Sequence, residues 1–261
     1  MRLGKSLIII VLACSFGVAR GQADDSLLDK IDFNEIARCL TKAQESDTNP
    51  KNQQYNMILA ADSILSKSVD SYQIYIAVYQ YLIGGFSELG ANMVVDYMVR
   101  MPYLEYVNAD TEQRNNIISI AESYSRVKIG SQAPEIHSVT VFDKEFDLYA
   151  INKKHVILLF WSYSCPHCRD LIDEMGKIST ENDDVAIVTV NVSGDFKKVR
   201  KLIKKSGLKD QYNICDGKGW DSQIVDDYAV DMTPSLILLD KDKIIIAKPF
   251  DIEEVIKYLE L

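Results

Sequence analysis

Two cysteines separated by two residues form the part of this sequence best suited to covalent chemistry. They occur as Cys165-Pro166-His167-Cys168, directly after the apolar run 156–161 and at the start of a segment with helical periodicity. A thiol at the N-terminus of a helix faces unpaired backbone N–H groups and the positive end of the helix dipole, which favour thiolate over thiol. The spacing therefore predicts that Cys165 attacks a disulfide and that Cys168, one helical turn further on, resolves the mixed disulfide.

The two residues between the cysteines also suit this chemistry. Pro166 would occupy the first helical turn, where its missing N–H costs no hydrogen bond. The imidazole of His167 would add partial positive charge near the sulfur. We therefore expect Pro166 and His167 to tune the reactive thiol, and we expect no metal and no organic cofactor.

Three other uses of these residues stay open on the sequence alone. A structural disulfide between Cys165 and Cys168 would close a tight and reducible loop. Zinc bound by Cys165, His167 and Cys168 would need a fourth ligand, and His137 and His155 lie on predicted strands without a cysteine pattern. A peroxidatic cysteine would need one reactive thiol in an electropositive pocket, whereas the close pair favours disulfide exchange.

The segment around the cysteine pair alternates between strand and helix patterns, which predicts an α/β fold with buried parallel strands and an antiparallel edge. Cys215 precedes Asp216-Gly217 and is expected at a strand end and turn. The patterns predict, in chain order, a hairpin over 139–148, a strand over 156–161, a helix over 166–179, a strand over 185–192, a basic helix over 195–206, strands over 235–239 and 243–248, and a final helix over 252–259.

The first half of the chain has helical periodicity from Ser26 to about Val127, which predicts an all-α bundle. Gly and Pro in the segment 128–134 mark a linker, so the expected organisation is a signal peptide over 1–23, a helical domain over 24–128 and an α/β domain over 129–261. The predicted helices are one ending near Leu40, one after Asn49-Pro50, one over 72–83 that ends at Gly84-Gly85, one over 87–100, and one over 111–127 capped by Asp110 with Gln113.

The run from Phe160 to Cys168, followed about 65 residues later by Met232-Thr233-Pro234-Ser235, resembles the active site of the thioredoxin fold. The resemblance implies that the Thr233-Pro234 bond is cis and faces the cysteine pair, so that the backbone at these two residues docks the substrate. It also implies that Trp161 helps to tune the site. The implied fold is a mixed sheet flanked by helices, C-terminal to the helical bundle.

Within that fold, the lead-in over 130–134, the hairpin and the insertion over 195–227 resemble the TlpA/ResA-like branch of exported thiol-disulfide oxidoreductases. The likeness covers residues 129–261. It implies disulfides or thiols of proteins or small molecules as substrates, and a redox partner in the membrane or envelope. The alternative is a partner-binding envelope protein in which the helical bundle recognises the partner and the thioredoxin domain is mainly a scaffold.

Three positions depart from the pattern of the family. Leu159 and Leu171 stand where related proteins carry acidic residues, and Asp173 stands where their helix has a kinking proline. Asp170 and Asp173 are expected on a solvated helix face. Because the CPHC motif resembles oxidising, DsbA-like proteins while the surrounding frame belongs to a branch rich in reductants, the sequence leaves the direction of electron flow unsettled.

The N-terminus predicts export. Arg2 and Lys5 precede an apolar run over 7–18, and small residues near Ala23 provide a cleavage site, so we expect a periplasmic protein. Two alternatives stay open: Cys14 ends a loose lipobox and would be lipidated in an envelope lipoprotein, or the run is retained as an anchor. The 38 acidic and 29 basic residues give a net charge of −9, which argues against nucleic-acid binding.

The remaining cysteines, Cys39 and Cys215, are expected to be buried small hydrophobic residues. An oxidising compartment would permit a bridge between them, but their spacing does not indicate one. The sequence also leaves the oligomeric state open.

Overall fold

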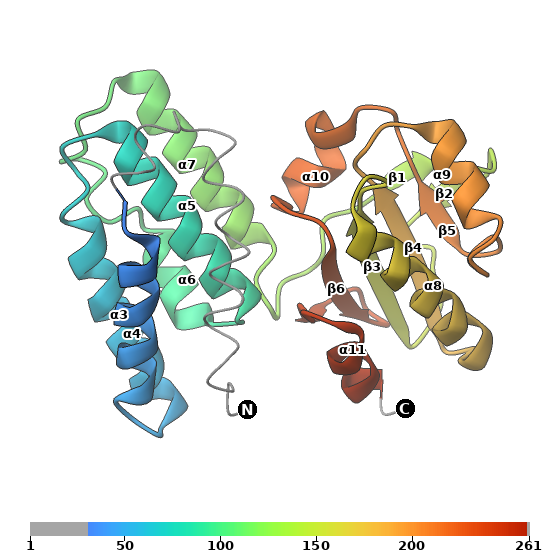
Figure 1. The fold of residues 1–261 in the computed structure, drawn as a ribbon, viewed down its shortest axis with the longest axis horizontal. Helices are drawn as coiled ribbons and strands as arrows, with labels where there is room; N and C mark the ends of the chain where they lie inside the picture. The colour runs from blue at the N-terminus through green and yellow to red at the C-terminus, as the bar shows by residue number, and fades with distance from the viewer. Residues whose placement is uncertain (1–30, 260–261) are drawn as a thin grey trace. The chain divides into compact units, whose positions relative to one another are not determined.

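The computed structural model describes residues 31–259, which form two compact units divided after Lys128 (Figure 1). The expected signal segment 1–23, with Cys14, lies outside the described residues. No helix in the described range is both long and apolar enough to cross a membrane.

The N-terminal unit is helical, as the sequence predicts. Its central helix is buried along most of its length and packs against three of its neighbours. The predicted cap of the last helix is confirmed, because the Asp110 carboxylate accepts from the Gln113 N–H and the Gln113 side chain accepts from the Asp110 N–H. The helices are α3 (Phe33–Glu45), α4 (Pro50–Leu65), α5 (Tyr72–Glu88, the central one), α6 (Asn92–Met98) and α7 (Thr111–Arg126).

The predicted helix end at Gly84-Gly85 is wrong. α5 continues through both glycines, which are buried, and the chain turns instead at Gly90, whose φ of 64° is left-handed. The next helix accordingly begins at Asn92 and not at Ser87. Burial of the surrounding apolar side chains outweighs the cost of about 1 kcal/mol that each glycine adds to a helix interior.

The C-terminal unit is built on a five-stranded mixed sheet in the order β5-β4-β3-β6-β7. β3 is parallel to β4 and β4 to β5, whereas β6 and β7 are antiparallel additions, which confirms the predicted α/β class and its antiparallel edge. The strands of this sheet are β3 (His155–Trp161), β4 (Val185–Asn191), β5 (Tyr212–Ile214), β6 (Ser235–Asp240) and β7 (Ile245–Ala247).

Helices flank this sheet, and a small hairpin precedes it (Figure 1). The hairpin pairs His137 with Asp147, so its first strand ends at Val139, where the predicted strand begins, and its second strand ends one residue earlier than predicted. These elements are β1 (His137–Val139), β2 (Glu145–Asp147), α8 (Pro166–Glu181), α9 (Phe196–Ile203), α10 (Gln223–Asp227) and α11 (Ile252–Leu259).

A glycine sets how closely α8 approaches the chain that follows α9. A Cβ atom at Gly176 would lie 1.8 Å from the carbonyl oxygen of Ser206, and Gly207, next along the chain, has a left-handed φ of 81°. Apolar side chains of α8, including Ile172 and Met175, are buried in the core shared with β3 and β4. The position of the helix that carries both cysteines therefore depends on a residue without a side chain.

Candidate active site

The antiparallel pairing of β3 with β6 brings both halves of the predicted site to one edge of the sheet. Phe160 pairs with Ser235, so the residues that follow β3 lie beside those that precede β6. The sulfur of Cys165 lies 3.8 Å from the carbonyl oxygen of Thr233, and the Thr233–Pro234 peptide bond is cis. Two motifs that are far apart in the sequence are thus adjacent in the fold.

The two thiols of the motif have different environments. Cys165 is half-buried and caps α8, because its Sγ accepts from the backbone N–H of Cys168 at 3.3 Å. Cys168 is fully buried, and this desolvation, with a hydrogen bond to Cys165, raises the pKa of the Cys168 thiol. The arrangement presents one sulfur to a substrate and keeps the other behind it as a thiol.

The three residues expected to tune the site lie at different depths. Pro166 occupies the first turn of α8, and both Pro166 and His167 are exposed. Trp161 is fully buried in the same core cluster as Cys168, and its indole Nε1 has no hydrogen-bond partner among the described residues. His167 is therefore open to solvent at the start of α8, whereas Trp161 lies in the core beneath the cysteine pair.

Asn191 is a residue of this edge that the sequence did not single out. It is buried at the end of β4, opposite Trp161, and its Nδ2 donates to the carbonyl of Trp161 at 3.2 Å. Its Oδ1 accepts from the backbone N–H and the hydroxyl of Ser193, at 3.0 and 2.7 Å. The Ser193 hydroxyl in turn accepts from the N–H of Tyr163 at 3.3 Å. This network holds the segment that leads into Cys165.

We expect Asn191→Ala to lower the free energy of unfolding by about 1–3 kcal/mol, because it removes three hydrogen bonds of a buried side-chain amide, one to the Trp161 carbonyl and two from Ser193. Denaturant unfolding measures this effect. The matched control is Asn152→Ala, an exposed asparagine of the same unit, which should change stability by less than about 0.5 kcal/mol. Equal stabilities of the two variants would show that the network does not hold the segment.

The positions that depart from the family pattern are apolar or solvated in the structure. Leu159 and Leu171 are buried in the core around the site. Asp170 and Asp173 are exposed, which confirms the expected solvated face. Neither of the usual acidic positions therefore supplies a carboxylate beneath the cysteines.

The other two described cysteines differ from each other. Cys215 is buried as predicted, its Sγ lies 3.9 Å from Oδ1 of Asn191, and burial raises the pKa of its thiol. The prediction of a buried Cys39 is wrong, because Cys39 lies on the solvent side of α3 with its Sγ 3.9 Å from Glu35. All four described cysteines are free thiols.

A second group of residues contains side chains that could bind a metal ion. Glu135, His137 and Asp147 place one ligand atom each within 4.8 Å of the others, His137 and Asp147 on the β1–β2 hairpin and Glu135 just before it. All three side chains are substantially exposed, and His137 directs one ring nitrogen to each carboxylate, Nε2 to Glu135 at 3.0 Å and Nδ1 to Asp147 at 3.6 Å. This is the geometry of two ion pairs to one imidazole.

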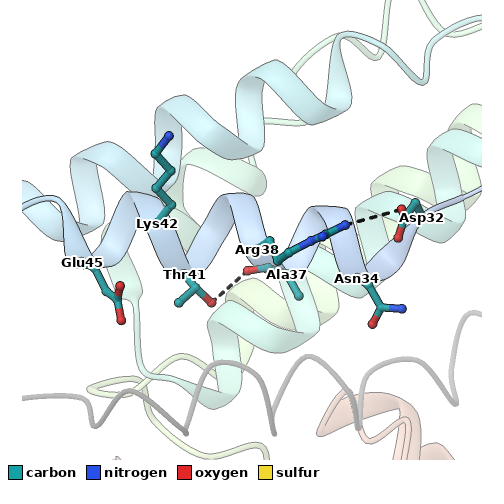
Figure 2. Close-up of a pocket in the computed structure, with 7 residues that line it drawn as sticks. All are labelled: Asp32, Asn34, Ala37, Arg38, Thr41, Lys42 and Glu45. Carbon is teal, nitrogen blue, oxygen red and sulfur yellow. Dashed lines mark hydrogen bonds and ion pairs between the residues drawn. The ribbon is translucent and has the colours of Figure 1, made fainter.

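A surface pocket of the helical unit lies along α3 (Figure 2). Its lining is mostly charged and includes Asp32, Arg38, Lys42 and Glu45. Arg38 lies 3.9 Å from Asp32, and the Thr41 hydroxyl donates to a carbonyl one turn earlier at 2.9 Å. No cysteine or histidine lines this pocket, so the edge of the sheet near Cys165 is the better candidate for redox chemistry.

Comparison with known proteins shows what the C-terminal unit is similar to. Residues 152–245 match a family model described as thioredoxin-like. The thioredoxin-like protein YneN of Bacillus subtilis is 27% identical over 115 residues, which cover 37% of this chain and 68% of that protein. The thiol-disulfide oxidoreductase ResA of Bacillus cereus is 24% identical over 125 residues, which cover 47% of this chain and 70% of that protein.

A solved structure extends the likeness in fold. A thioredoxin-like protein from Bacteroides caccae superposes with a TM-score of 0.54 at 15% identity, over 85% of this chain and 92% of its own. That coverage exceeds the unit Ile129–Leu261, so the likeness reaches into the helical part. The family match, the sheet order and this structural likeness show that the C-terminal unit has a thioredoxin-like fold, preceded by a helical unit.

Proposed function

We propose that this chain is an exported thiol-disulfide oxidoreductase that works through Cys165 and Cys168. The observation that carries the proposal is the pairing of a half-buried sulfur at the start of α8 with a fully buried thiol one turn further on, beside the Thr233 carbonyl. A pair with these unequal exposures suits sequential attack and resolution.

The proposed reaction consists of two thiol-disulfide exchange steps, in which the number of thiols and of electrons stays the same. The Cys165 thiolate attacks one sulfur of a substrate disulfide, which forms a mixed disulfide and releases the first substrate thiolate. Cys168 then loses its proton and attacks the Cys165 sulfur, which releases the second substrate thiolate and leaves the Cys165–Cys168 disulfide. The two leaving thiolates take up two protons, and the protein has given two electrons; the reverse sequence oxidises a dithiol.

The residues before β6 offer a docking edge for the substrate backbone. Thr233 and Pro234 are half-buried and directly precede β6, which begins at Ser235, so we expect a substrate peptide to form backbone hydrogen bonds at this end of the strand. A substrate docked there has its disulfide next to Cys165. We expect the substrates to be disulfides or thiols of envelope proteins or small molecules. We also expect a redox partner in the envelope to supply or consume them.

The proposal includes both the export of the protein to the periplasm and the use of the CPHC motif for exchange. The basic and apolar N-terminal segment supports export to the periplasm, with lipidation at Cys14 as the alternative. An oxidising compartment is one in which a reversible cysteine pair has disulfide clients to act on.

Equilibration with glutathione tests the proposal. We expect Cys165 and Cys168 to be oxidised together at a potential between about −240 and −150 mV, because the N-terminus of α8 and His167 favour the reduced form and so make the disulfide more oxidising. Thiol trapping and mass spectrometry measure the fraction oxidised. His167→Gln should move the potential downward.

The matched control for His167 is His137→Gln, since His137 is also an exposed histidine of the same unit. It should leave the potential unchanged. A pair that does not respond to the glutathione ratio would overturn the proposed function, and a potential below about −270 mV would make the protein a dedicated reductant.

A further inference from the structure

One helix of this acidic chain carries a dense positive charge. α9 and the turn after it contain six basic residues in positions 197–205, and positions 196–209 contain no acidic residue. All six are at least partly exposed. The basic surface consists of Lys197, Lys198, Arg200, Lys201, Lys204 and Lys205.

Most of this charge is not neutralised within the protein. Lys198 pairs with Asp195 at 2.8 Å and Arg200 with Asp143 at 3.3 Å. The other four lysines form no ion pair with any residue between 31 and 259. The chain as a whole has a net charge of −9, whereas this surface is positively charged. An anionic group that approaches the protein is therefore attracted to this surface.

The basic surface begins at the redox site. The Nζ of Lys198 lies 5.7 Å from the centre of the Tyr163 ring, two residues before Cys165. The loop that leads into α9 bonds the same residue, through the Ser193 hydroxyl and the Tyr163 N–H. A substrate whose disulfide reaches Cys165 therefore brings its flanking residues close to α9.

We propose that the basic surface of α9 recognises an acidic segment beside the disulfide of the protein's substrate. The inference rests on the proposed function and adds a substrate class to it. Charge complementarity of this kind raises the association rate by about tenfold or more at low salt and weakens as salt screens the charges.

The fold favours a protein segment over a lipid surface as the occupant. A basic helix binds membranes stably when its apolar face inserts among the lipids. In α9 most of that face is already used, because Val199 and Ile203 are buried in the core of the unit and Leu202 packs against it, which leaves Phe196 as the exposed apolar side chain of the helix. The available surface of α9 is therefore mainly its charged side, which begins beside Tyr163, two residues before Cys165.

The experiment compares three peptides with the same internal disulfide, flanked by glutamates, glutamines or lysines. Pre-reduced full-length protein is mixed with each peptide, and the second-order rate constant of peptide reduction is measured at low and high salt. We expect the glutamate peptide to react about tenfold faster than the lysine peptide at low salt, and the ratio to shrink at high salt.

Two double variants distinguish an effect of the basic surface on the peptide preference from an effect of the protein's net charge. Lys197→Glu with Lys201→Glu reverses two exposed, unpaired lysines of α9 and should abolish the preference for the glutamate peptide. Lys154→Glu with Lys257→Glu makes the same change in net charge at two exposed lysines outside α9 and should keep it. Thermal unfolding checks that both variants are folded.

The outcomes are distinct. Equal preference in both double variants, or no preference in the wild type, would overturn the proposal. Binding to phosphatidylglycerol vesicles that the α9 variant loses, without any peptide preference, would assign the surface to lipid and overturn it as well. Failure of the wild type to reduce even the glutamine peptide would instead count against the proposed function.

Discussion

Cys165→Ser should reduce disulfide exchange by roughly 10³-fold or more, to the uncatalysed rate, because it removes the sulfur that attacks. Cys168→Ser should behave differently. Its Cys165 still attacks, but no second thiol resolves the product, so mixed disulfides with the substrate accumulate. Non-reducing electrophoresis and mass spectrometry after incubation with a disulfide substrate measure both effects.

Cys39→Ser is the matched control for these variants, since Cys39 is an exposed thiol on α3 that is not part of the CPHC motif. It should exchange disulfides at the wild-type rate. Mixed disulfides that form through Cys168 in Cys165→Ser would reverse the roles of the two thiols. Full activity in Cys165→Ser would remove the CPHC motif from the chemistry.

Gly176→Ala should destabilise the C-terminal unit by about 3 kcal/mol or more. Helix propensity alone would make alanine better by about 1 kcal/mol at this position of α8. The added methyl group would instead lie 1.8 Å from the Ser206 carbonyl oxygen, a distance that only a backbone shift relieves, and such overpacking typically costs 1–3 kcal/mol and occasionally more. The clash therefore outweighs the propensity, and the net sign is destabilising.

Denaturant unfolding of the full chain, followed by the transition of the C-terminal unit, measures this loss. Glu174→Ala is the control, because Glu174 is exposed on the same helix and its replacement should change stability by less than about 0.5 kcal/mol. Since α8 carries both cysteines, Gly176→Ala should also slow exchange. A Gly176→Ala protein as stable as the control would contradict the close approach of α8 to Ser206.

The elements that were predicted correctly depend on residues that are close to them in the sequence. The cap at Asp110 depends on a residue three positions away, and the buried strands β3 and β4 are continuous apolar runs. The start of α8 at Pro166 follows from proline's preference for the first helical turn. The juxtaposition of Cys165 with Thr233 came from the resemblance to a known family and not from local pattern.

The predictions that are wrong concern residues whose positions depend on contacts with residues that are distant in the sequence. Gly84 and Gly85 have the local signature of a helix end, but their burial in the helical unit keeps them inside α5. Cys39 was expected to be buried, yet the buried apolar side of α3 is formed by Phe33, Ile36 and Leu40. Near the site, a buried asparagine at the end of β4 has no local signal, because its partners are the Trp161 carbonyl and Ser193.

The sulfur of Cys165 is both the proposed nucleophile and the atom that caps α8. A sulfur engaged in a mixed disulfide has lost the negative charge that makes it a good acceptor, so the first turn of the helix is held less firmly at that stage. The backbone N–H released belongs to Cys168, the residue that must act next. Formation of the intermediate thus frees the local backbone of the resolving cysteine at the point in the cycle where that cysteine has to move towards its target.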